Sequence, residues 1–306
     1  MALTTEDIAR LPVPVIRAAL PDWVAGHVAA PPEVLEPLRA SVAERAARAS
    51  DDEVAAMQAT FVGAGEEYRL YPADPFAREI TRRFMSVLTP TWEIRGREHL
   101  DSFLALGPGR RMIIANHLSY TDTQVTDVIF SKDGLTPLAD RLVAIAGPKV
   151  YTEPWRRMAA IALNTRKTAQ SGSVASEQEV LPPRELARIA FECIEECGRL
   201  MDQGMVVLLY PEGRRSRTGR LQPFLKAAHR YAGIADAQIL VMAQTGTEKI
   251  YPVGEGPMFP GHVDIAFAEP FVGADFPGRT GALLESHRRL ASLLPEERQP
   301  VEGAIA

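Results

Sequence analysis

Short apolar runs alternate with longer amphipathic stretches from about residue 76 onward, and this alternation predicts an α/β domain. The predicted strands are Met112–Ala115, Leu142–Ala146, Met205–Tyr210, Ile239–Ala243 and Val263–Phe267. Apolar residues at helical spacing predict helices over Phe76–Leu88 and Arg184–Gln203, each with one face able to cover a sheet. We therefore expect a mixed central sheet flanked by helices.

The residues before this point favour helices. Thr4 and Asp7 have the spacing of a capping box, and Pro32–Arg48 is rich in Ala, Leu, Glu and Arg. We therefore divide the chain into a small helical N-terminal domain, residues 1–75, and an α/β domain, residues 76–306. Ser171–Glu179 is polar and lacks periodicity, so it is expected to form a surface loop.

Composition and charge exclude several classes of protein. The 306 residues carry a formal net charge of −5, which argues against nucleic acid as a partner. No run approaches the roughly 18 apolar residues of a membrane helix, and the N-terminal residues lack a secretory pattern, so a cytoplasmic protein is expected. Cys193 and Cys197 lie on the apolar stripe of a predicted helix and are expected to be reduced core residues rather than metal or redox groups.

The first predicted strand is followed directly by His117, and Asp122 follows with four residues between them. A turn at this spacing can bring the two side chains together. A histidine can then take the proton from a substrate hydroxyl while the carboxylate holds the imidazole in the useful tautomer. The alternative is that Asp122 only caps a helix. The position favours catalysis, because active sites of α/β sheets gather at the C-terminal ends of strands.

A second group of polar residues follows the strand predicted at Met205–Tyr210. Within seven positions it holds four arginines next to two glycines: Arg214, Arg215, Arg217 and Arg220 with Gly213 and Gly219. Guanidinium groups and backbone N–H groups near glycines bind phosphate, although a solvated surface turn would have the same composition. Glu212 either holds one arginine or is oriented toward the hydroxyl of a substrate. A third basic pair, Arg166 and Lys167, is either a further anion contact or two exposed cations.

The two motifs in this order, Asn116-His117-x-x-x-x-Asp122 and Tyr210-Pro211-Glu212-Gly213-Arg214-Arg215-Ser216, resemble the glycerol-phosphate and lysophosphatidate acyltransferase superfamily. The resemblance covers roughly residues 92–271, with Tyr210 and Arg214 in place of the Phe and Thr of the usual F-P-E-G-T-R-S motif. It implies that His117 is the base and Asp122 its partner. It places the phosphate of the acceptor on Arg215, with Glu212 and Gly213 shaping the site.

Two further segments extend this resemblance. The segment at residues 147–154, GPKVYTEP, and the spacing of Arg215 and Arg217 are similar to the soluble plastid-type glycerol-3-phosphate acyltransferases, and Arg166 with Lys167 would supply another acceptor contact. The implied reaction moves a fatty acyl group from acyl-CoA or acyl-carrier protein to the sn-1 hydroxyl of glycerol 3-phosphate. Direct transfer is expected, because no G-x-S-x-G nucleophile elbow is present. No metal or other cofactor is expected, because the base and the phosphate contacts are side chains.

Other functions remain open from the sequence. Lysophosphatidate is the alternative acceptor, since it presents the same phosphate to the same arginines. An enzyme that uses lysophosphatidate must collect it from a bilayer, so peripheral contact with a membrane also stays open. A non-catalytic phospholipid- or phosphate-binding protein is the alternative from another class. A condensation-type or chloramphenicol-type acyltransferase fits less well, because those enzymes place three residues between His and Asp and have no basic glycine-containing loop.

Overall fold

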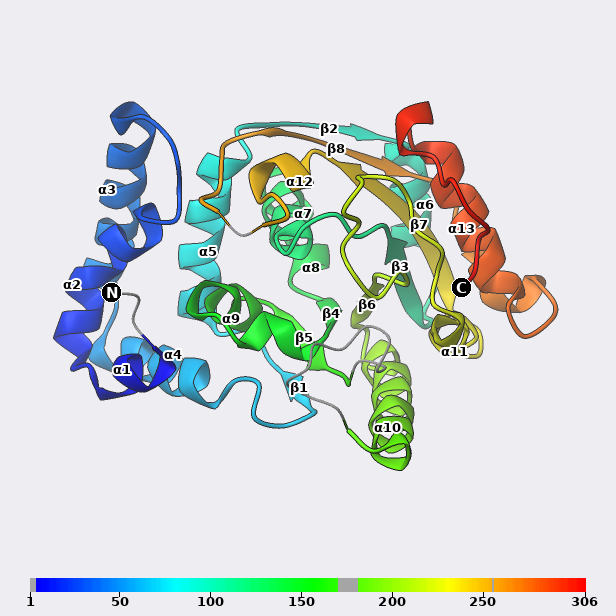
Figure 1. The fold of residues 1–306 in the computed structure, drawn as a ribbon, viewed down its shortest axis with the longest axis horizontal. Coiled ribbons are helices and arrows are strands. Elements are labelled where there is room, and N and C mark those ends of the chain that lie inside the picture. The colour runs from blue at the N-terminus through cyan, green and yellow to red at the C-terminus, as the bar shows by residue number, and fades with distance from the viewer. Residues whose placement is uncertain (1–3, 170–180, 255) are drawn as a thin grey trace.

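The computed structural model describes residues 4–169, 181–254 and 256–306, and the expected loop at Ser171–Glu179 lies outside these ranges. Figure 1 shows a twisted central sheet with helices packed on both sides, and the N-terminal helices at one end. The strands are β1 (Leu70–Tyr71), β2 (Thr91–Arg95), β3 (Arg111–Ala115), β4 (Leu142–Ala146), β5 (Asn164–Lys167), β6 (Val206–Leu209), β7 (Gln238–Thr245), β8 (His262–Phe267) and β9 (Phe271–Val272). The sheet is therefore mixed and flanked by helices, as the sequence predicts.

The order of the strands is β1-β5-β4-β6-β3-β7-β8-β2, and β9 pairs with β7. The central strands β5, β4, β6, β3 and β7 are parallel to one another, whereas β1, β8 and β9 pair in the antiparallel sense. The C-terminal ends of β3, β4, β5 and β6 consequently meet at one edge of the sheet. Loops that leave these four strands are brought together there.

Alternate residues of the central strands enter two different cores. In β3, Ile113 joins the core beneath α5 (Pro75–Leu88), α7 (Asp122–Lys132) and α9 (Pro154–Ile161). Met112 and Ile114 join the opposite core beneath α10 (Pro183–Asp202) and α13 (Gly281–Leu293). This period of two is the expected consequence of a strand that is buried on both faces.

The N-terminal helices are α1 (Thr5–Arg10), α2 (Val13–Ala25), α3 (Pro32–Arg48) and α4 (Asp51–Gly63). The capping box predicted at Thr4 and Asp7 begins α1. Buried residues of α2, α3 and α4 belong to the same apolar core as α5 and one face of the sheet. Strand β1 precedes residue 76 and pairs with β5, so the sheet starts just before the predicted division, and the division into two domains stays a prediction.

The remaining α-helices of the described residues are α6 (Arg97–Ala105), α8 (Thr136–Ala139), α11 (His229–Ala232) and α12 (Thr247–Ile250). Cys193 and Cys197 are fully buried on the inner face of α10 and are not joined by a disulfide, which confirms their predicted place in the core. Within the described ranges, no helix has both the length and the apolar character needed to cross a membrane.

Candidate active site

His117 lies just beyond the C-terminal end of β3, and its ring lines a pocket of about 820 Å³. Its Nδ1 is 2.7 Å from Oδ2 of Asp122, the first residue of α7. The Asp122 carboxylate is buried and also accepts hydrogen bonds from the backbone N–H groups of Leu118 and Ser119, at 2.7 Å and 3.0 Å. The backbone N–H groups of this turn therefore fix the Asp122 carboxylate, and the carboxylate orients the imidazole of His117. With Nδ1 engaged by a carboxylate, Nε2 is the ring nitrogen left to accept a proton.

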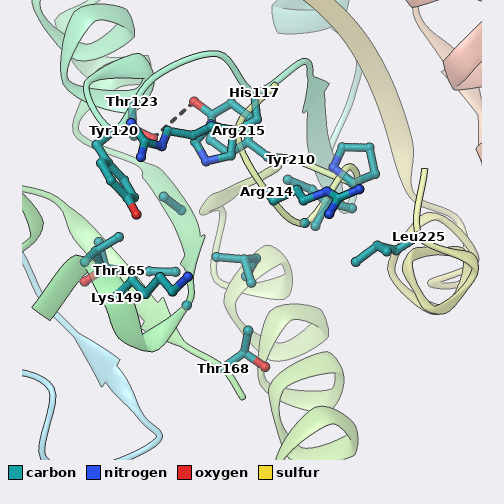
Figure 2. Close-up of a pocket in the computed structure, with 18 of the residues that line it drawn as sticks. His117, Tyr120, Thr123, Lys149, Thr165, Thr168, Tyr210, Arg214, Arg215 and Leu225 are labelled. Atoms are coloured by element: carbon teal, nitrogen blue, oxygen red, sulfur yellow. Dashed lines mark hydrogen bonds between the residues drawn. The ribbon is translucent and has the colours of Figure 1, made fainter. Parts of the chain in front are cut away.

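The His117 ring also stacks on Tyr210, which follows β6, with ring centroids 4.7 Å apart and an angle of 28° between the planes. The Tyr210 hydroxyl is 3.1 Å from Oγ1 of Thr123 (Figure 2). The ring of His117 is therefore held on an edge by Asp122 and on a face by Tyr210. Both contacts restrict its orientation before any substrate binds.

Glu212 connects the loop after β3 to the loop after β6. Its Oε1 accepts the backbone N–H of His117 at 2.6 Å, and its Oε2 accepts the backbone N–H of Gln222 at 2.9 Å. The backbone N–H of Ser216 completes the connection by donating to the carbonyl of His117 at 2.8 Å. Both carboxylate oxygens of Glu212 therefore accept backbone N–H groups, and among the described residues this carboxylate forms no ion pair with an arginine.

Burial raises the pKa of Glu212 to about 8. An unfolded Glu loses its proton near pH 4.3, so between about pH 4.5 and 8 the folded chain holds a proton that the unfolded chain has released. The free energy of unfolding should consequently fall as pH rises through this window, by up to about 1.4 kcal/mol per pH unit. Gln does not titrate in this range, so Glu212→Gln should lack this pH-dependent contribution to the free energy of unfolding. Denaturant unfolding of both proteins at pH 5, 6.5 and 8 should give a steeper decline for the wild type, and parallel declines would contradict the raised pKa.

The loop after β6 turns sharply at Gly213, whose φ of +70° lies in the left-handed region that favours glycine. A Cβ at this position would also lie 2.2 Å from Cδ1 of Leu225. The turn directs the next residues to the pocket, where Arg214, Arg215 and Arg217 all contribute to the lining. Nη1 of Arg215 is buried and has no hydrogen-bond partner among residues 4–169, 181–254 and 256–306. Such a donor is costly to leave unpaired, so this guanidinium is suited to bind an anion.

Figure 2 shows His117 and Arg215 at one end of the pocket, with Tyr120 and Lys149 on one side and Leu225 on the other. Lys149 and Arg156 both come from the connection between β4 and β5, so the connections that follow two parallel strands, β4 and β6, contribute arginine and lysine side chains to one cavity. The rest of the lining is largely apolar: Ala144, Ile145, Ala146, Val150, Trp155, Ala159, Ala160, Leu163, Leu186, Ala187, Ala190, Leu209, Leu225, Ala227, Ala228, Tyr231 and Val253. The cavity joins a cationic end to an apolar body, which suits an amphiphilic anion.

Arg166 and Lys167 do not line this pocket. They lie within β5, where Arg166 is 2% exposed and its guanidinium pairs with Glu196 of α10. Lys167 Nζ donates to the carbonyl of Gly65 at 2.8 Å and lies 4.2 Å from the centroid of the Tyr68 ring. The structure thus brings His117, Asp122, Glu212, Gly213, Arg215 and Arg217 together and places the third basic pair elsewhere, where it ties β5 to its neighbours.

Sequence reasoning did not identify three of the residues that complete the cationic end, namely Tyr120, Lys149 and Arg156. Tyr120 stands inside the first motif and Lys149 inside the GPKVYTEP segment, so both were close to recognised patterns. Arg156 had no such signal, because its role depends on how α9 packs against the loop after β3. Among the described residues, no three His, Cys, Asp or Glu side chains converge in the way a metal ion requires.

Known proteins are similar to this chain over the region that carries the site. The family model described as Acyltransferase matches residues 92–245, about half of the chain. The chloroplastic 1-acyl-sn-glycerol-3-phosphate acyltransferase BAT2 of Brassica napus is 33% identical over 105 residues, which are 34% of this chain and 30% of the relative. The chloroplastic enzyme LPAT1 of Arabidopsis thaliana, of the same description, is 32% identical over 105 residues, with the same coverage. The aligned segment therefore spans less than a third of either relative.

One solved structure is also similar, the 1-acyl-sn-glycerophosphate acyltransferase PlsC of Thermotoga maritima. Its sequence identity is 17% and its TM-score 0.45, over 71% of this chain and 78% of the other.

Proposed function

This chain belongs to the acyltransferase family, and we propose that it transfers a fatty acyl group from a thioester to the free hydroxyl of lysophosphatidate, 1-acyl-sn-glycerol 3-phosphate. The observation that carries the proposal is the contact of 2.7 Å between His117 and Asp122, in the same pocket as the arginine loop. A base and an anion-binding group in one cavity suit a substrate that has a hydroxyl and a phosphate a few bonds apart.

In the proposed reaction, Nε2 of His117 takes the proton of the acceptor hydroxyl as the oxygen attacks the thioester carbonyl. The C–O bond forms, the C–S bond breaks through a tetrahedral intermediate, and the thiolate leaves with the proton returned by the imidazolium. Asp122 stabilises the imidazolium while it exists. Arg215 and Arg217 hold the phosphate, and the donor is acyl-CoA or acyl-carrier protein.

The choice of acceptor rests on the relatives and on the shape of the cavity. The motif spacing favours glycerol 3-phosphate, whereas the proteins from Brassica napus and Arabidopsis thaliana are named for 1-acyl-sn-glycerol 3-phosphate. The apolar lining beside the cationic end also suits an acceptor that already carries one acyl chain. We leave Arg166 and Lys167 out of the proposed acceptor site, because their side chains are buried against other partners.

The test is an assay of free thiol release from palmitoyl-CoA with each acceptor at matched donor concentration. We expect kcat/KM for lysophosphatidate to exceed that for glycerol 3-phosphate at least about tenfold, because burial of even two CH₂ groups contributes roughly 1.6 kcal/mol. Higher kcat/KM for glycerol 3-phosphate would reverse the choice of acceptor and leave acyl transfer intact. If neither acceptor releases thiol while the protein still binds lysophosphatidate, the non-catalytic phospholipid-binding function takes its place.

A further inference from the structure

The arginine loop, residues 213–222, carries Arg215 and Arg217 on the wall of the pocket. The backbone N–H of Ser216 fixes its inner side on the loop after β3. Its outer turn is centred on Gly219, whose φ of +73° lies in the left-handed region. The sequence pattern suggests this glycine for phosphate binding, but Gly219 does not line the pocket, so its place in the loop has another reason.

Arg298, the last residue of the short 3₁₀ helix Glu296–Arg298, lies against this outer turn. Its Nη1 donates to the carbonyl of Gly219 at 3.1 Å, and its own carbonyl accepts the backbone N–H of Leu221 at 2.9 Å. A Cβ at residue 219 would lie 1.9 Å from Nη1, so a larger residue there would displace the guanidinium from this contact. Gly219 therefore serves the approach of Arg298 to the loop.

The other end of the Arg298 guanidinium is held by Glu248 of α12. Nη2 donates to Oε1 of Glu248 at 2.5 Å, and the two side chains are 20% and 16% exposed, so salt screens this ion pair little. Oε2 of Glu248 accepts the backbone N–H of Gly246, directly after β7, at 2.9 Å. The hydrogen bond from Arg220 to the carbonyl of Gln299 is long, at 3.3 Å, and involves no carboxylate, so it contributes less. Arg298 thus ties the outer turn of the arginine loop to the end of β7.

We propose that Arg298 and Glu248 are positioning residues, which hold the arginine loop in the conformation that places Arg215 and Arg217 on the phosphate of the acceptor. This inference rests on the proposed function, because the loop that they hold is the proposed phosphate site. Arg217 is two residues from Gly219, so a shift of the outer turn moves its backbone, and small misplacements of a binding group are costly. Arg298 and Glu248 both lie outside the two sequence motifs and outside the matched residues 92–245.

The test compares Arg298→Met with wild type in steady-state kinetics with lysophosphatidate at saturating palmitoyl-CoA. Methionine keeps an apolar stem and removes both side-chain donors. KM for the acceptor should rise by about 3- to 30-fold with kcat changed by less than about twofold, because Arg215 and Arg217 are still present but misplaced. Arg298→Lys keeps the charge but loses the fork that reaches two partners, so it should recover part of the loss.

Glu248→Gln tests whether the two residues act together. Alone it should raise KM by about 2- to 10-fold, because the arginine keeps its contact with Gly219 but loses its ionic partner. Since Glu248 acts on the loop through Arg298, the double variant should have the KM of Arg298→Met to within about twofold. If the two single effects multiply instead, Glu248 acts without Arg298 and the inference is wrong.

Arg289→Met is the matched control. Arg289 of α13 pairs with Glu285 at 2.6 Å, with side chains 18% and 10% exposed, and it donates to the carbonyl of Glu269. It is therefore buried and paired like Arg298, but these partners lie outside the arginine loop. Its loss should lower the melting temperature and leave KM unchanged. A wild-type KM in Arg298→Met, or an equal rise of KM in both variants, would overturn the inference.

Two measurements without turnover separate this inference from the proposed reaction. Hydrogen–deuterium exchange of the amides of residues 216–222 should be faster in Arg298→Met than in wild type and Arg289→Met. Glycerol 3-phosphate, used as a phosphate monoester probe, should bind Arg298→Met more weakly than either. If wild type releases no thiol but both measurements distinguish the variants in this way, the positioning role stands and the acyl-transfer proposal fails. If thiol is released but Arg298→Met has wild-type exchange and KM, the reverse holds. If Arg298→Met does not fold, Arg298→Lys and Glu248→Gln undergo the same comparisons.

Discussion

Replacing His117 with alanine is expected to lower kcat for acyl transfer by about 10²–10⁴-fold, while KM for the acceptor changes little. The substitution removes the imidazole that Asp122 and Tyr210 hold at the end of the pocket. The contacts of residue 117 with Glu212 and Ser216 are made by its backbone, so they survive in the alanine variant. The loss should therefore appear in the chemical step and leave the fold in place. Thiol release from palmitoyl-CoA at saturating lysophosphatidate measures it.

His262→Ala provides the control for this experiment, because His262 is exposed on β8 and does not line the pocket. Its turnover should equal that of the wild type. Asp122→Asn should lie between the wild type and His117→Ala, since the ring loses its orienting carboxylate but keeps its nitrogen. Near wild-type turnover in His117→Ala would remove this residue from the mechanism.

Arg215→Ala should lower kcat/KM for lysophosphatidate by about 10- to 150-fold, mainly through KM, because a hydrogen bond to a charged group contributes roughly 1.5–3 kcal/mol. The buried Nη1 of this arginine is the donor that the phosphate would satisfy. Arg215→Lys keeps the charge but loses the planar fork, so it should recover only part of the loss. Initial rates over a range of acceptor concentration give both constants.

Arg220→Ala is the control from the same loop. Arg220 does not line the pocket, and its Nη1 donates to the carbonyl of Gln299 at 3.3 Å. Its substitution should leave KM for the acceptor unchanged. A KM in Arg215→Ala equal to that of the wild type, with kcat reduced instead, would assign Arg215 to the transition state rather than to binding of the phosphate.

The core strands could be predicted because each is an apolar run buried on both faces, as in Leu142–Ala146, which β4 matches residue for residue. Four strands were missed for physical reasons. β2 is an edge strand, its odd residues are exposed, and its sequence TWEIR has no apolar run. β1 and β9 have two residues each. β5 reads NTRK, a polar sequence that becomes buried because Glu196 and Gly65 supply partners for its two cations.

Some features of the candidate site could likewise be predicted from the sequence, and others could not. His117 and Asp122 could be paired from the sequence because a single turn joins them, and Glu212, Gly213 and Arg215 are adjacent in one loop. Contacts between segments that are far apart in the sequence could not be predicted. The stacking of Tyr210 on His117 and the meeting of Arg156 with Tyr120 depend on the order of the strands, which local patterns do not specify.

The hydrogen bond from His117 to Glu212 joins residues 95 positions apart, across the parallel pair of β3 and β6. Between these two strands the chain leaves the pair, builds β4 and β5, and returns along α10. Contacts of such long sequence separation form late, because a large loop must close before they contribute any stabilisation. The geometry of the proposed active site is therefore expected to form in the last stages of folding. A chain that has already gained its helices will still be inactive until β6 docks beside β3, so the return of activity during refolding should lag behind the return of helical circular dichroism.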